Sequence, residues 1–441
     1  MSSVPKPREG KMRILHISPM YFPVIGGAER HLKEISERLT ARGHEVTVFT
    51  VNARDGWDLA EGRYGGFPRV EIVNGVKIIR FRPDGERWVR VLDKMLDTVP
   101  RLKGGYRYLS WLFTPEGLKQ LRLNPRVFTM IPHILRFDAD IVATINWHWP
   151  TAYYAYLARK LKCFTLVGIP LFETAMNWCH GTIYKSMLAS CDAVLTNTRH
   201  EGQFVQERGG VRVAVASVGI DPEAFEERNG SEIRARYSIN GLPVVGYVGR
   251  QVEGKGALKL LQSMKEVWRW NSDVRVLLAG PRSPSRDEMG SIIDTFTNVE
   301  RERIIRIDEF AEKDKASIYD ACDVFVLPST GESFGIAYLE AWLCGKPVIG
   351  GRIGSTQCVV EEGVDGLLVD PADPEHIGRG IIELLSDRHK RETMGRRGRA
   401  KTLAQFTWEK VTDRVEKLYT ELVAAKRARR LSAAESETTL G

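Results

Sequence analysis

The chain has 441 residues, of which 43% are apolar and 27% are charged, and its formal net charge is +8. This composition is typical of a folded globular protein and excludes collagen-like and wholly disordered chains. The length suits two or three domains, because a domain usually holds roughly 100–200 residues. The positive charge is too diffuse to indicate a nucleic-acid partner, but it is compatible with an anionic substrate or a membrane surface.

The sequence shows neither a membrane span nor a secretory signal. Residues 1–11 are charged and are expected to be a flexible N-terminus, and no apolar run approaches the roughly 18–20 residues that cross a bilayer. The six cysteines include no C-x-x-C pair, which is typical of reduced, mostly buried thiols. We therefore expect a cytoplasmic protein, and a place at the inner face of the membrane stays open.

Short β-branched runs alternate with helical patterns along the chain, which is typical of a parallel α/β sheet. A first strand is predicted at 12–17, and a glycine turn leads to a helix at about 28–42. This series belongs to an N-terminal domain predicted over 12–215. Its further predicted strands are 46–50, 76–81, 141–145, 165–168 and 193–196.

Residues 86–136 form a basic, aromatic insertion in that domain. Ten basic residues stand against four acidic ones, interleaved with Trp88, Tyr106, Tyr108, Trp111, Leu112, Phe113 and Phe128. Such a mixture can lie at a lipid headgroup boundary, which would give a peripheral membrane contact. The alternative is an inserted helical subdomain whose aromatic residues form a core.

The strand–helix pattern restarts after residues 218–221 and defines a second domain over 216–407. A charged helix is predicted over 408–430, and a disordered tail over 431–441. The predicted fold class is α/β, with two Rossmann-like doubly wound parallel sheets facing across a cleft. The predicted strands of the second sheet are 244–248, 275–279, 304–307, 324–327, 347–350 and 367–369.

Ligands of parallel sheets bind where the strands end, so the loops after strands carry the candidate site. Gly26 and Gly27 lie between the first strand and the first helix. They let the backbone approach a ligand closely and leave N–H groups of the helix N-terminus for an anion. A tight turn without a ligand explains them equally well.

Residues 249–256 (GRQVEGKG) follow the first strand of the second domain and nearly spell a phosphate loop. Gly256 stands where a Ser or Thr would hold magnesium, which disfavours a nucleotide triphosphatase. Arg250 and Lys255 are then placed to hold a diphosphate. The alternative is a solvated basic loop.

Residues 328–341 (PSTGESFGIAYLEA) carry a strand end, a loop and a helix start. In this interpretation the Glu340 carboxylate accepts both hydroxyls of a ribose and that of Glu332 accepts hydroxyls of a sugar ring. Backbone N–H groups at the helix start can meet phosphate oxygens. Helix capping would explain Glu332 but not Glu340. The residues expected to bind a ligand here are Glu332, Ser333, Phe334, Gly335, Ile336 and Glu340.

The segment GESFGIAYLEAWLCGKPVIG resembles the E-x7-E element of glycosyltransferase family 4. PVIGGAERHL, VGIDPEAF, YVGRQVEGKG, LLAGPRS and EGVDGLLVD agree with that family in order and spacing. The resemblance covers roughly residues 12–52 and 135–425, and joint occurrence makes it specific. It implies a GT-B fold and transfer of a sugar from a nucleoside-diphosphate sugar with retention of configuration, without a required metal or other cofactor.

The resemblance also implies roles for the residues named above. Arg250 and Lys255 would bind the donor diphosphate and neutralise it as it leaves. Glu340 would hold the ribose and Glu332 the donor sugar, and the glycine pair 26–27 would lie near the diphosphate and the acceptor. Backbone groups of 353–356 would add contacts, and the final helix would return to the first domain.

Two polar motifs need separate interpretation. His148 stands about two residues later than the family's active-site His, so it is either that residue after a loop shift or a loop His packed beside two tryptophans. Asp138-Ala139-Asp140 spells the D-x-D of metal-dependent transferases. Because it precedes a predicted strand, at the edge opposite the site, a turn is favoured and no metal is expected.

The sequence thus predicts a retaining hexosyltransferase acting in glycan, polysaccharide or glycolipid biosynthesis. The acceptor hydroxyl would belong to a carbohydrate or lipid-linked molecule. No carboxylate is an evident nucleophile, so a front-face displacement is favoured, with Arg250, Lys255, Glu332 and His148 as catalytic candidates. Alternatives are a GT-B sugar-nucleotide epimerase or phosphorylase and a non-catalytic carbohydrate- or membrane-binding protein.

Overall fold

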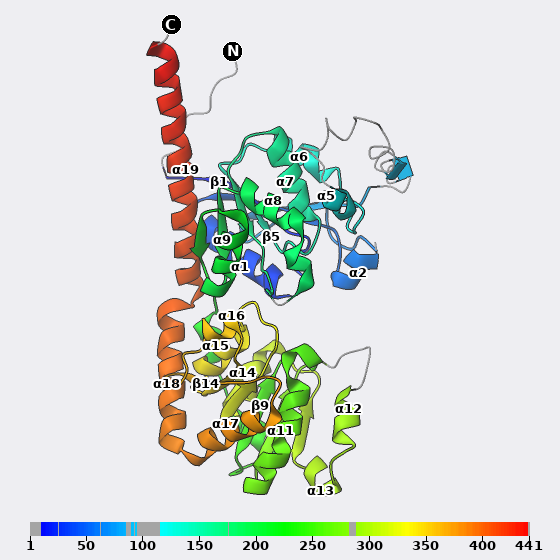
Figure 1. Cartoon of the computed structure of the whole chain (residues 1–441), viewed down its shortest axis with the longest axis vertical. Helices are drawn as coiled ribbons and strands as arrows, with labels where there is room; N and C mark the ends of the chain where they lie inside the picture. The colour runs from blue at the N-terminus through cyan, green and yellow to red at the C-terminus, as the bar shows by residue number, and fades with distance from the viewer. Residues whose placement is uncertain are drawn as a thin grey trace. The chain divides into compact units, whose positions relative to one another are not determined.

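The computed structural model describes residues 10–24, 26–61, 63–84, 90–91, 93–94, 115–174, 176–281 and 288–439. The chain divides into two compact units (Figure 1). Unit 1 comprises residues 1–197, 201–216 and 412–441, and unit 2 comprises residues 198–200 and 217–411.

Unit 1 is built on an eight-stranded sheet of order β3-β4-β2-β1-β5-β6-β7-β8. The strand order reverses between β1 and β5, which pair directly in parallel. This reversal is the mark of a doubly wound sheet. The strands are β1 (Arg13–Ile17), β2 (Glu45–Val51), β3 (Val70–Val73), β4 (Val76–Phe81), β5 (Ile141–Ile145), β6 (Leu166–Ile169), β7 (Ala193–Thr196) and β8 (Val213–Val215).

The edge strand β3 departs from the predicted all-parallel sheet, because it pairs antiparallel with β4. Asn74 and Gly75 join the two strands with φ angles of 48° and 81°. Positive φ at both turn residues is what a tight Asn-Gly hairpin requires. The predicted doubly wound sheet is therefore confirmed, and the correction is one antiparallel edge strand.

Helices cover the unit 1 sheet, and α1 illustrates why they form. Leu32, Ile35 and Leu39 recur at helical spacing and are buried against the sheet. Gly43 follows the helix with a φ of 92°, a conformation that favours glycine at a helix end. The helices in this part of the chain are α1 (Gly27–Ala41), α2 (Gly56–Glu61), α5 (Pro115–Gln120), α6 (Met130–Arg136), α7 (Thr151–Leu161), η2 (Asn177–His180), α8 (Thr182–Ser190) and α9 (Arg199–Gly209).

The basic, aromatic insertion predicted at 86–136 lies largely outside the described residues. Of its aromatic side chains named above, the structure describes Phe128 alone. Phe128 packs against the core of unit 1, with its ring 5.7 Å from that of Tyr154. This one side chain is therefore a core residue, and the others remain predictions.

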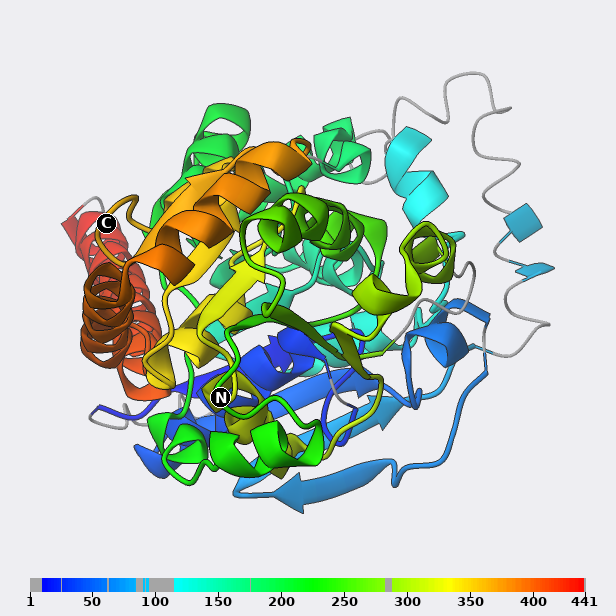
Figure 2. The ribbon, with the colours of Figure 1, turned by 90° about the horizontal axis from the view of Figure 1, so that it is seen from below.

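Unit 2 contains a six-stranded, all-parallel sheet of order β11-β10-β9-β12-β13-β14. Its order reverses between β9 and β12, and α11 and α17 pack side by side along it (Figure 2). The strands are β9 (Val244–Val248), β10 (Arg275–Ala279), β11 (Ile304–Ile307), β12 (Val324–Leu327), β13 (Val348–Gly351) and β14 (Gly366–Val369). The helices are η3 (Pro222–Phe225), α10 (Gly230–Arg236), η4 (Glu253–Lys255), α11 (Ala257–Trp270), α12 (Glu288–Ile293), α13 (Asn298–Arg301), η5 (Glu312–Asp314), α14 (Lys315–Asp320), α15 (Ile336–Leu343), α16 (Gly354–Gln357), α17 (Pro374–Ser386) and α18 (Arg388–Gln405).

The final helix α19 runs from Trp408 to Thr439, so residues 431–439 are helical where a disordered tail was predicted. The segment holds no glycine or proline before Gly441, and its Ala and Glu residues favour helix. From Thr412 onward α19 belongs to unit 1. There its Glu416 carboxylate contacts the Arg42 guanidinium at 2.6 Å and the His44 ring at 2.8 Å.

No helix in the described part of the chain has an apolar stretch that could span a bilayer.

Candidate active site

The loop after β9 carries the two cations predicted to hold a diphosphate. Arg250 is exposed, and its carbonyl accepts a 2.6 Å hydrogen bond from the Tyr247 hydroxyl. Lys255 lies in η4, and Gly256 follows with a φ of 78°. A Cβ at Gly256 would lie 2.1 Å from the Pro328 carbonyl oxygen, so the hydroxyl residue of a phosphate loop does not fit there.

The loop after β12 is fastened to the loop after β9. The Ser329 hydroxyl donates to the Gly254 carbonyl at 2.8 Å, and the Thr330 N–H donates to the same oxygen at 3.1 Å. β9 and β12 are neighbours at the point where the strand order of unit 2 reverses. Ligands of doubly wound sheets bind at this position.

An ion pair joins the two loops. Lys255 Nζ lies 2.6 Å from Glu332 Oε1 and 3.3 Å from the Gly331 carbonyl, and the two side chains are 21% and 10% exposed. The Ser355 hydroxyl donates to the Glu332 carbonyl at 2.6 Å, which ties the loop to α16. The predicted phosphate-binding and sugar-binding side chains are thus direct neighbours.

Helix α15 presents the second predicted glutamate. Gly335 caps its N-terminus with a φ of 90°, and a Cβ at this position would lie 2.5 Å from the Tyr338 ring. The Tyr338 N–H donates to the Gly335 carbonyl at 3.1 Å, whereas the N–H groups of Ile336 and Ala337 have no backbone acceptor among the described residues. Ser333 and Ile336 are half-buried, while Phe334 and Gly335 are buried. An anion at this helix start could therefore meet the N–H groups of Ile336 and Ala337.

Glu340 is buried on α15 and both of its carboxylate oxygens have protein partners. The Tyr319 hydroxyl donates to Oε2 at 2.7 Å, and Lys315 Nζ lies 3.3 Å from Oε1. Burial and the nearby Glu340 raise the pKa of Tyr319 well above its ordinary value. Burial alone would lower the pKa of Lys315, but Glu340 and Glu312 raise it overall. The local sequence around Glu340 does not predict these partners, because Tyr319 is 21 residues away from it in the chain.

In unit 1 the predicted site residues lie at the corresponding place in the other sheet. Gly26 and Gly27 stand between β1 and α1, and His148 follows β5, the neighbour of β1 at the reversal. His148 is exposed, and its ring makes edge contacts with Trp149 at 5.7 Å and Trp178 at 5.1 Å.

The two glycines of unit 1 are not equivalent. A Cβ on Gly26 would lie 2.1 Å from Glu29 Oε2, whereas a Cβ on Gly27 would meet nothing within 4 Å. Glu29 is buried, which raises the pKa of its carboxyl. Gly26 therefore makes room for a side chain of α1, and Gly27 leaves open space beside the backbone.

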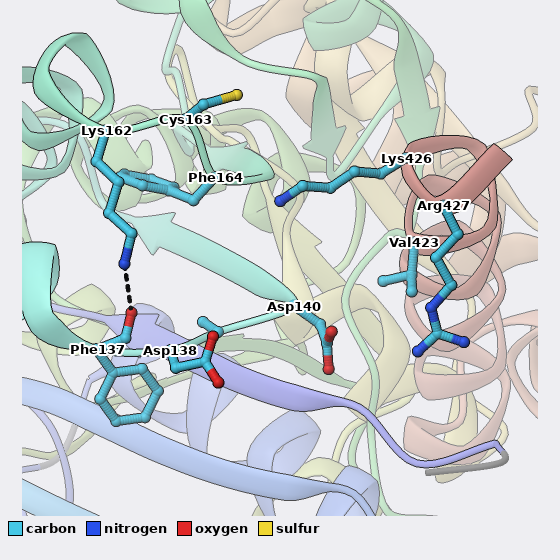
Figure 3. A pocket seen from close by; sticks show the side chains of 10 residues that line it. Phe137, Asp138, Asp140, Lys162, Cys163, Phe164, Val423, Lys426 and Arg427 are labelled. Carbon is cyan, nitrogen blue, oxygen red and sulfur yellow. Dashed lines mark hydrogen bonds between the residues drawn. The ribbon is translucent and has the colours of Figure 1, made fainter. Parts of the chain in front are cut away.

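The D-x-D sequence lies at the opposite edge, just before β5. Asp140 accepts the Arg13 N–H at 2.8 Å, and Asp138 accepts the Arg13 side chain at 2.7 Å. Both line a cavity of about 150 Å³ together with Lys162, Lys426 and Arg427 (Figure 3). No group of three or more His, Cys, Asp or Glu side chains suited to a metal occurs among the described residues. Both aspartates are thus engaged with Arg13 of β1.

Two doubly wound sheets, each with candidate ligand-binding residues at its strand-order reversal, are the arrangement expected of the GT-B class. The family model described as Glycosyltransferase Family 4 matches residues 25–224, and that described as Glycosyl transferases group 1 matches residues 230–401. A D-inositol 3-phosphate glycosyltransferase from Corynebacterium urealyticum is 32% identical, over 93% of this chain and 96% of that protein. The chain belongs to glycosyltransferase family 4.

Solved structures agree with this fold. Sucrose-phosphate synthase from Thermosynechococcus elongatus matches with a TM-score of 0.70 at 20% identity, over 94% of this chain and 100% of that one. HepE from Anabaena, in complex with UDP and glucose, matches with a TM-score of 0.68 at 19% identity, over 93% and 99%. The GT-B prediction is confirmed, and so is the prediction of a retaining glycosyltransferase that uses a nucleotide-sugar donor.

Proposed function

We propose that the protein transfers a hexosyl group from a UDP-sugar to a hydroxyl of a carbohydrate or lipid-linked acceptor. The observation that carries this proposal is the Lys255–Glu332 ion pair at the reversal of the unit 2 sheet, with Arg250 in the same loop after β9. The choice of UDP is supported by HepE, whose structure holds UDP and glucose.

In this proposal unit 2 binds the donor. Lys255 has three N–H donors, and two of them reach Gly331 and Glu332, so one remains for a phosphate oxygen. Arg250 is exposed and has no ion-pair partner among the described residues, so its guanidinium is free to bind the same diphosphate. Glu332 accepts hydroxyls of the sugar and Glu340 those of the ribose. N–H groups at the start of α15, from Ser333 to Ile336, bind phosphate oxygens.

The reaction is a front-face displacement. The bond between the anomeric carbon and the leaving phosphate oxygen breaks, and the acceptor oxygen forms a bond on the same face of the sugar. The acceptor proton passes to the leaving diphosphate. The two cations stabilise the charge that develops on that diphosphate, and groups of this kind are each worth roughly 3–4 kcal/mol.

In unit 1 we propose that Gly26, Gly27 and His148 serve the ligand at the carboxyl edge of β1 and β5. The open space beside Gly27 lets a ligand approach the backbone closely. The exposed imidazole of His148 can exchange hydrogen bonds with a sugar hydroxyl. Relatives named D-inositol 3-phosphate glycosyltransferase make that cyclitol phosphate the first acceptor to examine.

Calorimetric titration with UDP-, GDP- and ADP-sugars tests the donor. We expect UDP-sugars to bind most tightly, followed by turnover when D-inositol 3-phosphate and other polyols are supplied, with product configuration read by NMR. Binding of GDP- or ADP-sugars alone would overturn the choice of base. Donor turnover that yields an epimer or a sugar phosphate would overturn the transfer reaction.

A further inference from the structure

We propose that Tyr319 and Lys315 are positioning residues that fix the Glu340 carboxylate for recognition of the donor ribose. This inference rests on the proposed function, in which Glu340 binds the ribose. The two residues lie on α14, and Glu340 lies on α15.

Tyr319 holds one carboxylate oxygen from inside the core. Its side chain is fully buried, and its hydroxyl donates to Glu340 Oε2 at 2.7 Å. The ring is fixed by packing against Phe325, with centroids 5.3 Å apart, and against Phe225 at 6.4 Å. A hydroxyl on a ring held in this way fixes the direction of the carboxylate as well as its place.

Lys315 holds the other oxygen from the side nearer to solvent. Its Nζ lies 3.3 Å from Glu340 Oε1 and 2.7 Å from Glu312 Oε1, and its side chain is 15% exposed. A cation beside an almost buried carboxylate offsets the cost of keeping that carboxylate charged. The Glu340 carboxylate is therefore well placed to accept hydrogen bonds from a ligand.

The contacts with Tyr319 and Lys315 orient the Glu340 carboxylate and still leave it able to accept further hydrogen bonds. An ionised carboxylate offers about four lone-pair positions, two on each oxygen. Tyr319 and Lys315 use one on each oxygen. The two that remain match the two neighbouring hydroxyls of a ribose, and their direction is set by the positions already occupied.

Comparing the affinities of two nucleotides distinguishes a role of Tyr319 in positioning Glu340 from a general role in stability. The variant is Tyr319→Phe, and the probes are UDP and 2′,3′-dideoxy-UDP, which lacks the hydroxyls that Glu340 would hold. We expect calorimetry to show about fivefold weaker binding of UDP, the effect of one lost hydrogen bond, and less than twofold change for the dideoxy nucleotide. Equal weakening of both nucleotides, or no weakening of either, would overturn the proposal.

Matched variants complete the experiment. Lys315→Met is expected to raise the donor KM several-fold with little change in kcat, while Lys315→Arg should restore most of the affinity. Lys313→Met removes an exposed lysine that precedes α14 by two residues, and Tyr419→Phe removes a buried hydroxyl in unit 1. Both controls should leave UDP binding unchanged. If the unaltered protein binds UDP no more tightly than 2′,3′-dideoxy-UDP, the proposed recognition of the ribose by Glu340 is wrong. If the two control variants also lose the preference for UDP over the dideoxy nucleotide, only the positioning role of Tyr319 and Lys315 is overturned.

Discussion

The ammonium nitrogen of Lys255 lies 2.6 Å from Oε1 of Glu332, although the two residues are 77 positions apart in the sequence. The side chain proposed to hold the donor diphosphate is therefore paired with the side chain proposed to hold the donor sugar. Each fixes the position of the other before a donor arrives. Pre-organisation of this kind lets charged groups act without reorganising during the reaction.

Replacing Lys255 with Ala should lower turnover far more than stability. Loss of one cation at the leaving diphosphate is expected to reduce kcat by about a hundredfold, equivalent to about 3 kcal/mol. Unfolding in urea should change by less than about 2 kcal/mol, because the pair joins two loops and Lys255 keeps contact with solvent at 21% exposed. Initial rates with a UDP-sugar measure the first effect. Lys259→Ala on α11 is the control, and parallel loss of stability and turnover would contradict the catalytic role.

Gly256→Ser should destabilise the protein even though it restores the sequence of a phosphate loop. The new Cβ would lie 2.1 Å from the Pro328 carbonyl oxygen, at a φ of 78° that side chains rarely adopt. We expect a loss of about 3 kcal/mol in the free energy of unfolding, from steric overlap and backbone strain together. Gly254→Ser, where a Cβ meets nothing within 4 Å, should cost less than about 1 kcal/mol. Similar losses in both variants would refute the steric explanation.

Gly27→Ala tests whether a ligand approaches the unit 1 turn. A Cβ at Gly27 meets nothing within 4 Å, so thermal unfolding should stay nearly unchanged. A ligand that contacts this backbone would be displaced, and kcat/KM should fall about tenfold, equivalent to about 1.4 kcal/mol. Full activity in this variant would show that no substrate group lies against Gly27.

Glu201 should make stability depend on pH. The side chain is buried in unit 1, and its carboxylate accepts N–H groups of Phe172 and Asn197, both at 2.8 Å. Burial raises its pKa from 4.5 to about 7. Between these values the folded protein binds more protons than the unfolded chain, so the stability contributed by Glu201 is full below pH 4.5 and is lost as the pH rises through 7.

The measurement is urea unfolding from pH 4.5 to 8 for the unaltered protein and for Glu201→Gln, which does not titrate. The difference in free energy of unfolding between the two proteins should change by about 3 kcal/mol over this interval. Taking the difference removes the contribution of the other carboxyl groups. A constant difference would show that Glu201 titrates normally.

Local sequence was enough for every strand of the two sheets except β3 and β8. The predicted limits of the strands at 76–81, 141–145, 193–196, 244–248 and 324–327 coincide with β4, β5, β7, β9 and β12. These runs are short, rich in β-branched residues and flanked by turn residues, which together identify them as strands. β8 was not predicted, and with three residues (Val213–Val215) it offers little local pattern. The sequence VNGV did contain the signal for the β3–β4 hairpin.

The sequence by itself also determined which side chains follow β9 and β12, and it identified the family through their spacing. Only the tertiary structure decided that Lys255 meets Glu332, that Gly256 is required by Pro328, and that Tyr319 and Lys315 hold Glu340. The spacing of residues along the chain determines which side chains share a face of one helix or strand. Contacts between residues far apart in sequence depend on which strands become neighbours at the reversal of the sheet, and that order is set by the packing of the whole unit.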